Sequence, residues 1–321
     1  MAAFAAAFRS AFLRAVRQNA LVVVLAGTVL LCLLAPVGTA FGFHEEEALL
    51  RDVGLSTVFL GLILVGIVTA GGAAPLRSSM GLFALRPYGG LVFAAGSWAG
   101  SLAAGLLGGS VVLCCGFVLL RHRVLAFADW RAFGLLASAS LLAVAGGAWK
   151  NFRRGSSFAQ WAVVLAATGS LAAFLGAWFW APTGELRWDL PAEDILLIQT
   201  LLICGCMGVA AFAAAWTGAV LAGRIGGILL AWGVLCLGMA RQGMHGIPLW
   251  LDAPLGVLLP DLGLLWPGES FYADILTLPW DYVAAGCLYL LVWSLGFSAL
   301  GLTLWVSRRP GALRGAELRK A

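Results

Sequence analysis

The stretch GGLVFAAGSWAGSLAAGLLGGSVVLCCGFVLL, residues 89–120, has no charged side chain over 32 consecutive positions. A helix needs about 20 apolar residues to cross the hydrocarbon core of a bilayer, so this stretch is long enough to span a membrane. The rest of the chain is similar, since 62% of its 321 residues are hydrophobic and 11% are charged. A soluble domain carries about 25% charged residues. The sequence therefore predicts an all-α, polytopic membrane protein.

Eight apolar segments are predicted to cross the membrane. They cover residues 20–42, 53–74, 91–120, 133–149, 158–181, 193–222, 225–243 and 280–306. The segment 133–149 is the shortest of them, and a crossing helix has about 17–25 residues. If this segment does not cross fully, every later segment faces the opposite side.

The distribution of charge predicts the orientation of these spans. With the N-terminus inside, fourteen Lys and Arg residues fall in inner loops and six fall in outer loops. Inner loops carry an excess of Lys and Arg in membrane proteins, so we expect both termini in the cytoplasm. The same map places fourteen of the fifteen acidic residues outside. The basic loop from Arg121 to Arg131 is the exception, because it falls outside.

Residues 1–19 are predicted to form an amphipathic helix on the inner membrane face. Four apolar side chains recur every fourth position and would form one stripe: Phe4, Phe8, Phe12 and Val16. Three arginines lie mostly off this stripe: Arg9, Arg14 and Arg17. A basic helix with one apolar face is typical of an interfacial helix. A cleaved signal peptide is the alternative, but the apolar run that follows is longer than a signal core.

The segment before the third span contains a predicted helix end and a turn. Pro87 disfavours helical geometry at Arg86, and Gly89 with Gly90 permits a sharp turn. Residues 75–87 can therefore form a short inner-face helix before the turn, whereas the local residues by themselves favour an ordinary tight loop. After the turn, small residues recur every fourth position along one face: Gly96, Gly100, Ala104 and Gly108. Such a face lets another helix approach closely.

Several functions are disfavoured by what the chain lacks. Its acidic residues lie in predicted loops or at span ends, whereas proton-coupled carriers keep ionisable groups deep in the membrane. A phosphate-binding P-loop needs Gly-Lys-Ser/Thr, and the two lysines, Lys150 and Lys320, follow Trp149 and Arg319. The three histidines and seven cysteines form no haem-ligand or metal-ligand pattern. We therefore expect no cofactor, no metal and no catalytic residues, and an energy source in a separate subunit.

Short motifs near both ends of the chain occur in a recognisable order. They are DVGLS at 52–56, LRP at 85–87, FAAG at 93–96, LLPDL at 258–262, PWDY at 279–282 and RR at 308–309. This series resembles the permease subunits of type-2 ABC transporters, including those for nitrous-oxide-reductase maturation and gliding motility. The resemblance covers residues 1–120 and 195–310. It implies an exporter subunit of the bacterial inner membrane, without nucleic-acid binding.

The resemblance assigns a role to each segment. Residues 1–19 would be the elbow helix, 133–181 an inserted hairpin, 244–279 a re-entrant outer segment and 307–321 a cytoplasmic tail. Residues 75–90 would be the coupling loop that contacts a cytosolic ATPase, through Arg77, Ser78, Ser79, Met80, Phe83, Arg86, Pro87 and Tyr88. A second permease copy or a paralogue would complete the transporter.

This chain departs from the family pattern at the coupling loop. Leu76-Arg77-Ser78-Ser79 replaces an acidic residue and Gly-Thr, Gly89-Gly90 replaces Ser-Arg, and Ser97 replaces Lys. The lost charges favour one alternative, a non-transporting structural or assembly subunit of a larger membrane complex. A secondary carrier is the other alternative, and the absence of buried charges disfavours it.

Overall fold

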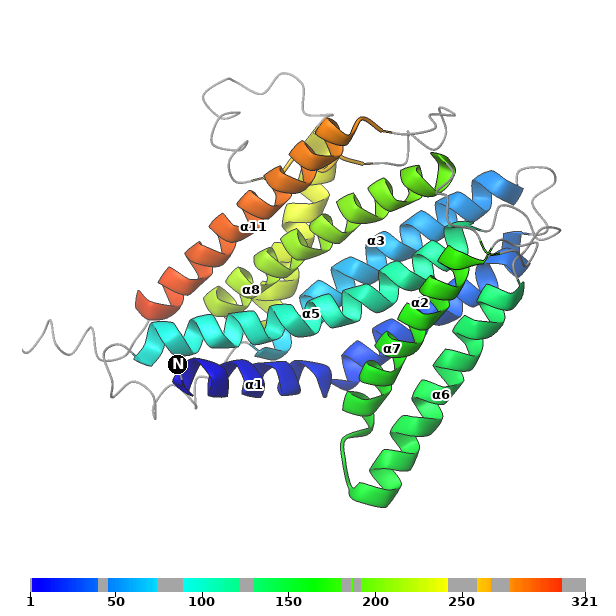
Figure 1. Cartoon of the computed structure of the whole chain (residues 1–321). Coiled ribbons are helices and arrows are strands. Elements are labelled where there is room, and N and C mark those ends of the chain that lie inside the picture. The colour runs from blue at the N-terminus through cyan, green and yellow to red at the C-terminus, as the bar shows by residue number, and fades with distance from the viewer. Residues whose placement is uncertain are drawn as a thin grey trace, which may run out of the picture.

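The computed structural model describes residues 2–39, 46–73, 89–121, 130–180, 186, 192–241, 259–266 and 278–307. Its helices are α1 (Ala2–Val16), α2 (Asn19–Thr39), α3 (Glu46–Ala73), α5 (Gly89–Arg121), α6 (Trp130–Arg154), α7 (Phe158–Phe179), α8 (Ala192–Ala240) and α11 (Trp280–Ser307). They lie side by side as a bundle, with α1 alongside the first half of α5 (Figure 1).

Within the described part of the chain, seven helices are long and apolar enough to cross a membrane: α2, α3, α5, α6, α7, α8 and α11. The prediction of a polytopic helical membrane protein is therefore confirmed. Helix α6 has 25 residues and is longer than the predicted span 133–149. The residues beyond this span include Lys150, Arg153 and Arg154, whose long side chains combine an apolar body with a polar end and suit a membrane boundary.

Helix α8 contains a break that folds it back on itself. Gly223 has φ 77° and ψ −167°, a conformation that is essentially restricted to glycine, and Ala222 is also non-helical. A Cβ atom on Gly218 would lie 2.8 Å from the Cβ atom of Leu230, so residues on either side of the break are in contact. The break falls between the predicted spans 193–222 and 225–243, and the second half of α8 runs back behind the first (Figure 1).

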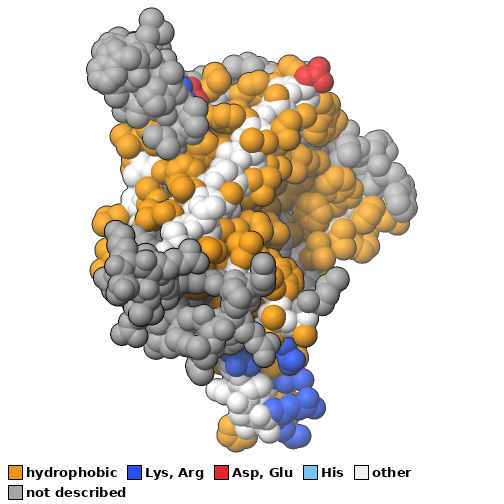
Figure 2. Space-filling model, turned by 90° about the vertical axis from the view of Figure 1, so that its left-hand side faces the viewer, with side chains coloured by type: hydrophobic (Ala, Val, Ile, Leu, Met, Phe, Trp, Pro, Cys, Tyr) orange, Lys and Arg blue, Asp and Glu red, His pale blue; other side chains and the backbone are white. Residues whose placement is uncertain are grey.

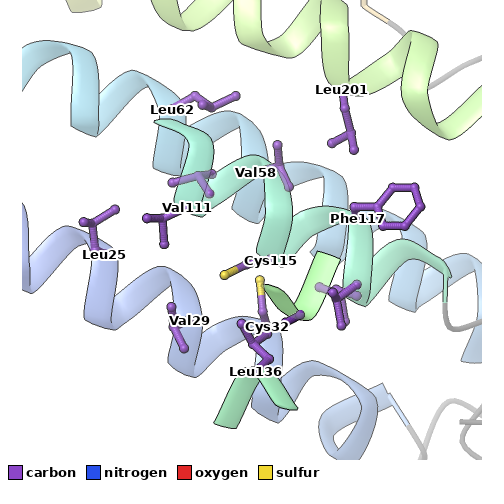
Figure 3. Packing of buried hydrophobic residues seen from close by; sticks show 14 of the residues in the cluster. Leu25, Val29, Cys32, Val58, Leu62, Val111, Cys115, Phe117, Leu136 and Leu201 are labelled. Atoms are coloured by element: carbon purple, nitrogen blue, oxygen red, sulfur yellow. The ribbon is translucent and has the colours of Figure 1, made fainter. Parts of the chain in front are cut away.

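Helix α3 lies at the centre of the bundle and runs antiparallel to α5. Glycines on α5 let the two helices approach, since Cβ atoms on Gly105 and Gly108 would each lie 3.0 Å from side chains of Thr69 and Val65. Figure 3 shows one of the two apolar cores, in which α2, α3 and α5 meet around Cys32, Val58 and Cys115. Small residues here allow close backbone packing, which is a main source of stability between membrane helices.

Helices α6 and α7 form an antiparallel hairpin beside α5. A Cβ atom on Gly147 would lie 3.2 Å from the backbone nitrogen of Ala162, so the two helices touch closely. The hairpin joins the bundle through aromatic contacts, with the ring centroids of Phe117 and Phe174 4.7 Å apart. Its turn extends beyond the neighbouring helices at the lower end of Figure 1.

Candidate functional site

Three turns of the chain and the end of α3 meet at one end of the bundle, which we call the basic end. Arg17, after α1, donates from Nε to the Oε1 atom of Gln160 at the start of α7, at 3.0 Å. Gln18 covers Gly72 near the end of α3, where a Cβ atom would overlap its amide. The same helix end lies beside the α8 break, since a Cβ atom on Gly71 would be 4.0 Å from Arg224.

Cations are concentrated at this end. The described Lys and Arg side chains of α1, of the last turns of α6 and of the adjoining turns are Arg9, Arg14, Arg17, Lys150, Arg153, Arg154 and Arg224. Figure 2 shows Lys and Arg side chains gathered at the lower end of one face, and Asp or Glu side chains near the opposite end. At the turn between α6 and α7, Phe152 is 88% exposed among these cations.

The predicted coupling loop joins two helices at the basic end. Helix α3 ends at Ala73 and α5 begins at Gly89. Because Thr69 lies opposite Gly105, α5 extends about three turns beyond the end of α3. The predicted coupling residues Arg77, Ser78, Ser79, Met80, Phe83, Arg86, Pro87 and Tyr88 lie outside the described residues.

Helix α1 packs against these first turns of α5 at the predicted small-residue face. A Cβ atom on Gly96 would lie 2.7 Å from the carbonyl oxygen of Phe4, and one on Gly100 would overlap the carbonyl oxygen of Phe8. Further along, Ala104 is fully buried, and Gly108 faces side chains of α2 and α3. The small-residue face of α5 is therefore packed against other helices of the same chain.

The face that α1 presents to the protein is made of alanines. Ala7, Ala11 and Ala15 are buried, whereas the ring of Phe4 remains 40% exposed. Phe4, Phe8 and Phe12 stack along the helix, with successive ring centroids 6.4 and 6.3 Å apart. Sequence reasoning identified the phenylalanine stripe and missed the alanine face beside it. The sequence contained a pattern that predicts this face, because Ala7, Ala11 and Ala15 recur every fourth residue, as the glycines on α5 do.

Polar contacts that sequence reasoning missed tie α11 to α5 and α8. Trp98 on α5 donates from Nε1 to the Oγ atom of Ser298 at 3.1 Å. Thr217 on α8 donates to the carbonyl oxygen of Phe297 at 2.7 Å. These partners are 200 and 80 residues apart in the sequence, so no local pattern could pair them.

Part of the predicted re-entrant segment lies at the other end of the bundle. Asp261 accepts from the backbone nitrogen of Leu264 at 3.1 Å, which closes a local turn. Tyr282 donates to the carbonyl oxygen of Leu264 at 2.6 Å, and Leu262 donates from its backbone nitrogen to Gly238 at 3.2 Å. Residues 259–266 are thus held against α8 and α11, while 244–258 and 267–277 lie outside the described residues.

No protein family, curated protein or solved structure matches this chain. Among the residues that the structure describes, no three His, Cys, Asp or Glu side chains are grouped as metal ligands. What the described residues present is a close-packed helical bundle with cations at one end. Together with its seven long apolar helices, these features place the chain in the class of multi-pass helical membrane proteins.

Proposed function

We propose that this chain is the membrane-spanning permease subunit of an ATP-driven ABC exporter in a bacterial cytoplasmic membrane. It would work with a separate cytosolic ATPase and with a second permease copy or a paralogue. The observation that carries this proposal is the position of the two helix ends that residues 74–88 connect. Helix α3 ends and α5 begins at the basic end, where Gln18, between α1 and α2, covers Gly72 and Phe8 of α1 lies against Gly100.

The path of the chain supports an arrangement with both termini in the cytoplasm. Counting the two halves of α8 separately turns the seven long apolar helices of the described residues into eight segments that alternate in direction, and an even number returns the chain to its starting side. The basic end would then face the cytoplasm, as the excess of Lys and Arg in inner loops requires. Helix α1 would be the elbow helix of this plan, and the α6–α7 hairpin its insertion.

In this arrangement, a conformational change of the ATPase would be transmitted to the membrane domain through residues 75–90. A displacement of these residues would act on the end of α3 and on the start of α5. Glycine contacts with α1 and the bond from Trp98 to Ser298 would carry the movement to α1 and α11. The chain has no Gly-Lys-Ser/Thr sequence, so ATP would be hydrolysed in the partner subunit.

The orientation can be tested by cysteine labelling of intact cells. Thr183→Cys, in the predicted outer loop, should react with a membrane-impermeant maleimide above the level of the wild type. Phe152→Cys is the matched inner position, because Phe152 is 88% exposed at the turn between α6 and α7. It should react only after the cells are permeabilised. If Thr183→Cys is protected and Phe152→Cys is labelled in intact cells, the chain has the opposite orientation and the proposed one is wrong.

The coupling role can be tested by removing the two charges of residues 75–90. Arg77→Ala with Arg86→Ala should reduce the amount of ATPase that co-purifies with the tagged chain from its native membrane. Truncating a buried, hydrogen-bonded charge at an interface costs about 2–5 kcal/mol. Membrane insertion should persist, since twelve inner Lys and Arg residues remain. The readouts are the yield of ATPase and its stimulated hydrolysis rate.

The matched control removes two charges elsewhere at the basic end. Arg153→Ala with Arg154→Ala, at the end of α6, should leave ATPase recovery unchanged. Equal recovery from both double variants would show that Arg77 and Arg86 are not the coupling contacts. If no P-loop ATPase co-purifies with the wild type, the transporter proposal fails. The non-transporting structural subunit, which the lost coupling charges favour, would then replace it.

A further inference from the structure

An apolar groove of about 480 Å³ runs between α5, α7 and α8, with α3 as its floor. It is distinct from the basic end and from residues 75–90. Gly66 of α3 lies at the bottom of the groove, and buried Phe212 forms part of its wall. At the mouth, Leu106 and Leu202 are 56% and 47% exposed. In a membrane this mouth faces hydrocarbon, so a lipid chain can enter sideways without crossing water.

The dimensions of the groove decide what fits in it. Its lining on α5 extends from Leu102 to Phe117, which is about 22 Å of helix. The groove is thus long and apolar, with a volume of about 480 Å³ along this length. An extended hydrocarbon chain is an occupant of matching shape and polarity.

The lining offers apolar contact along its whole length. Leu, Val, Phe and Trp side chains predominate, and the hydroxyl of Ser110 donates to the carbonyl oxygen of Leu107 at 2.8 Å. Gly205 leaves space at the wall, because a Cβ atom there would lie 3.6 Å from the nearest side chain, Leu113. Within a bilayer, apolar groups associate by van der Waals contact, and a long narrow groove provides such contact on several sides of a chain.

One end of the groove lies next to a cation. Phe117 is the last residue of α5 in the lining, and the guanidinium carbon of Arg121, one turn further, lies 5.8 Å from the centre of its ring. A guanidinium has five N–H donors and binds phosphate well. An anionic phospholipid carries its phosphate in the headgroup, at the membrane surface where a spanning helix ends. An acyl chain in the groove would place its own headgroup near this end of α5.

We propose that the groove binds one acyl chain of an anionic phospholipid, with the headgroup phosphate at Arg121. The proposal goes beyond the assignment as a permease and stands whether or not an ATPase binds the chain. It is tested with the full-length protein in vesicles of phosphatidylcholine and phosphatidylglycerol. A trace of phosphatidylglycerol carries a photoactivatable diazirine on one acyl chain, and the cross-linked residues are mapped by mass spectrometry.

Cross-links in the wild type are expected to concentrate at Leu106, Leu113 and Leu202. The internal comparison is the exposed face of α11, where Leu288 and Leu295 are 63% and 60% exposed and report ordinary surrounding lipid. Equal labelling of groove and α11 leucines would overturn the proposal. So would a cross-link between two copies of the chain through the groove, because this would make it a subunit interface.

A larger side chain that fills the groove should abolish cross-linking of the lipid probe to the groove residues. A Cβ atom on Gly205 would lie 3.6 Å from Leu113, an ordinary contact, and Gly205→Leu would extend from there into the groove. Groove labelling should fall to the level of the α11 leucines, because the leucine side chain would occupy the space that the acyl chain fills. Gly296→Leu is the control on α11, since a Cβ atom there meets nothing within 4 Å. Unchanged groove labelling in Gly205→Leu would contradict the proposal.

The headgroup is tested by replacing the cation and by changing the probe. Arg121→Gln should lower groove labelling by the phosphatidylglycerol probe towards the level given by a phosphatidylcholine probe with the same diazirine chain. The wild type should prefer phosphatidylglycerol. Equal labelling by both lipids in the wild type would refute the assignment of the headgroup to Arg121. If Gly205→Leu fails to fold, the wild-type map and this comparison of two probes still decide the outcome.

Discussion

Gly100→Leu is expected to release α1 from α5 and to prevent assembly of the protein. A Cβ atom at Gly100 would overlap the carbonyl oxygen of Phe8 and lie 3.0 Å from the backbone nitrogen of Phe12. Both obstacles are main-chain atoms of a helix, so no side-chain rotation relieves them. Overpacking of an interior usually costs about 1–3 kcal/mol. We expect the upper end of this range or more, because the whole helix must move.

The release of α1 can be measured by proteolysis and by oligomer size. Trypsin should cut after Arg14 faster in Gly100→Leu than in the wild type, and the assembled species should be lost on size exclusion. Gly134→Leu is the matched control, since a Cβ atom at that exposed position of α6 meets nothing within 4 Å. A wild-type cleavage rate and oligomer size in Gly100→Leu would show that α1 does not depend on this contact.

Gln199→Leu is also expected to have a large effect, a decrease in the free energy of unfolding. The fully buried amide of Gln199 donates from Nε2 to the carbonyl oxygen of Leu278 at 2.8 Å and accepts from its backbone nitrogen at 2.9 Å. This pair of bonds attaches the chain just before α11 to α8. Leucine would leave the N–H and C=O groups of partly buried Leu278 without these partners, and an unpaired group costs about 1–3 kcal/mol when it is fully buried. Because water can reach Leu278 in part, the expected loss is roughly 1–3 kcal/mol in total.

The measurement is thermal unfolding in detergent, followed by the accessibility of the native cysteines. Cys287 lies on α11, so loosening of this helix should expose its thiol at a lower temperature than in the wild type. Thr168→Val is the control, because this exposed hydroxyl bonds only to carbonyl oxygens of its own helix. A melting temperature in Gln199→Leu that equals that of the control would rule out a stabilising role for the bonds to Leu278.

The sequence alone determined the properties that depend on local composition. Long uncharged runs must form helices in a bilayer, because every backbone polar group needs a partner within its own segment. The run around Gly100 therefore predicted a spanning helix, and the structure has α5 there. Arg224 between two apolar runs placed a boundary in 193–243, and the α8 break falls at Ala222 and Gly223. The spacing of the small residues also indicated a face for close approach.

Only the tertiary structure decided which groups meet, because the partners are far apart in the sequence. The spacing of Gly96 and Gly100 could not say that their neighbour is α1 rather than another copy of the chain. Nothing local pairs Trp98 with Ser298 or Gln199 with Leu278. The groove is likewise shaped by four helices at once. Hydrophobicity specifies that a segment enters the membrane, whereas the fit of one helix surface against another specifies its neighbours.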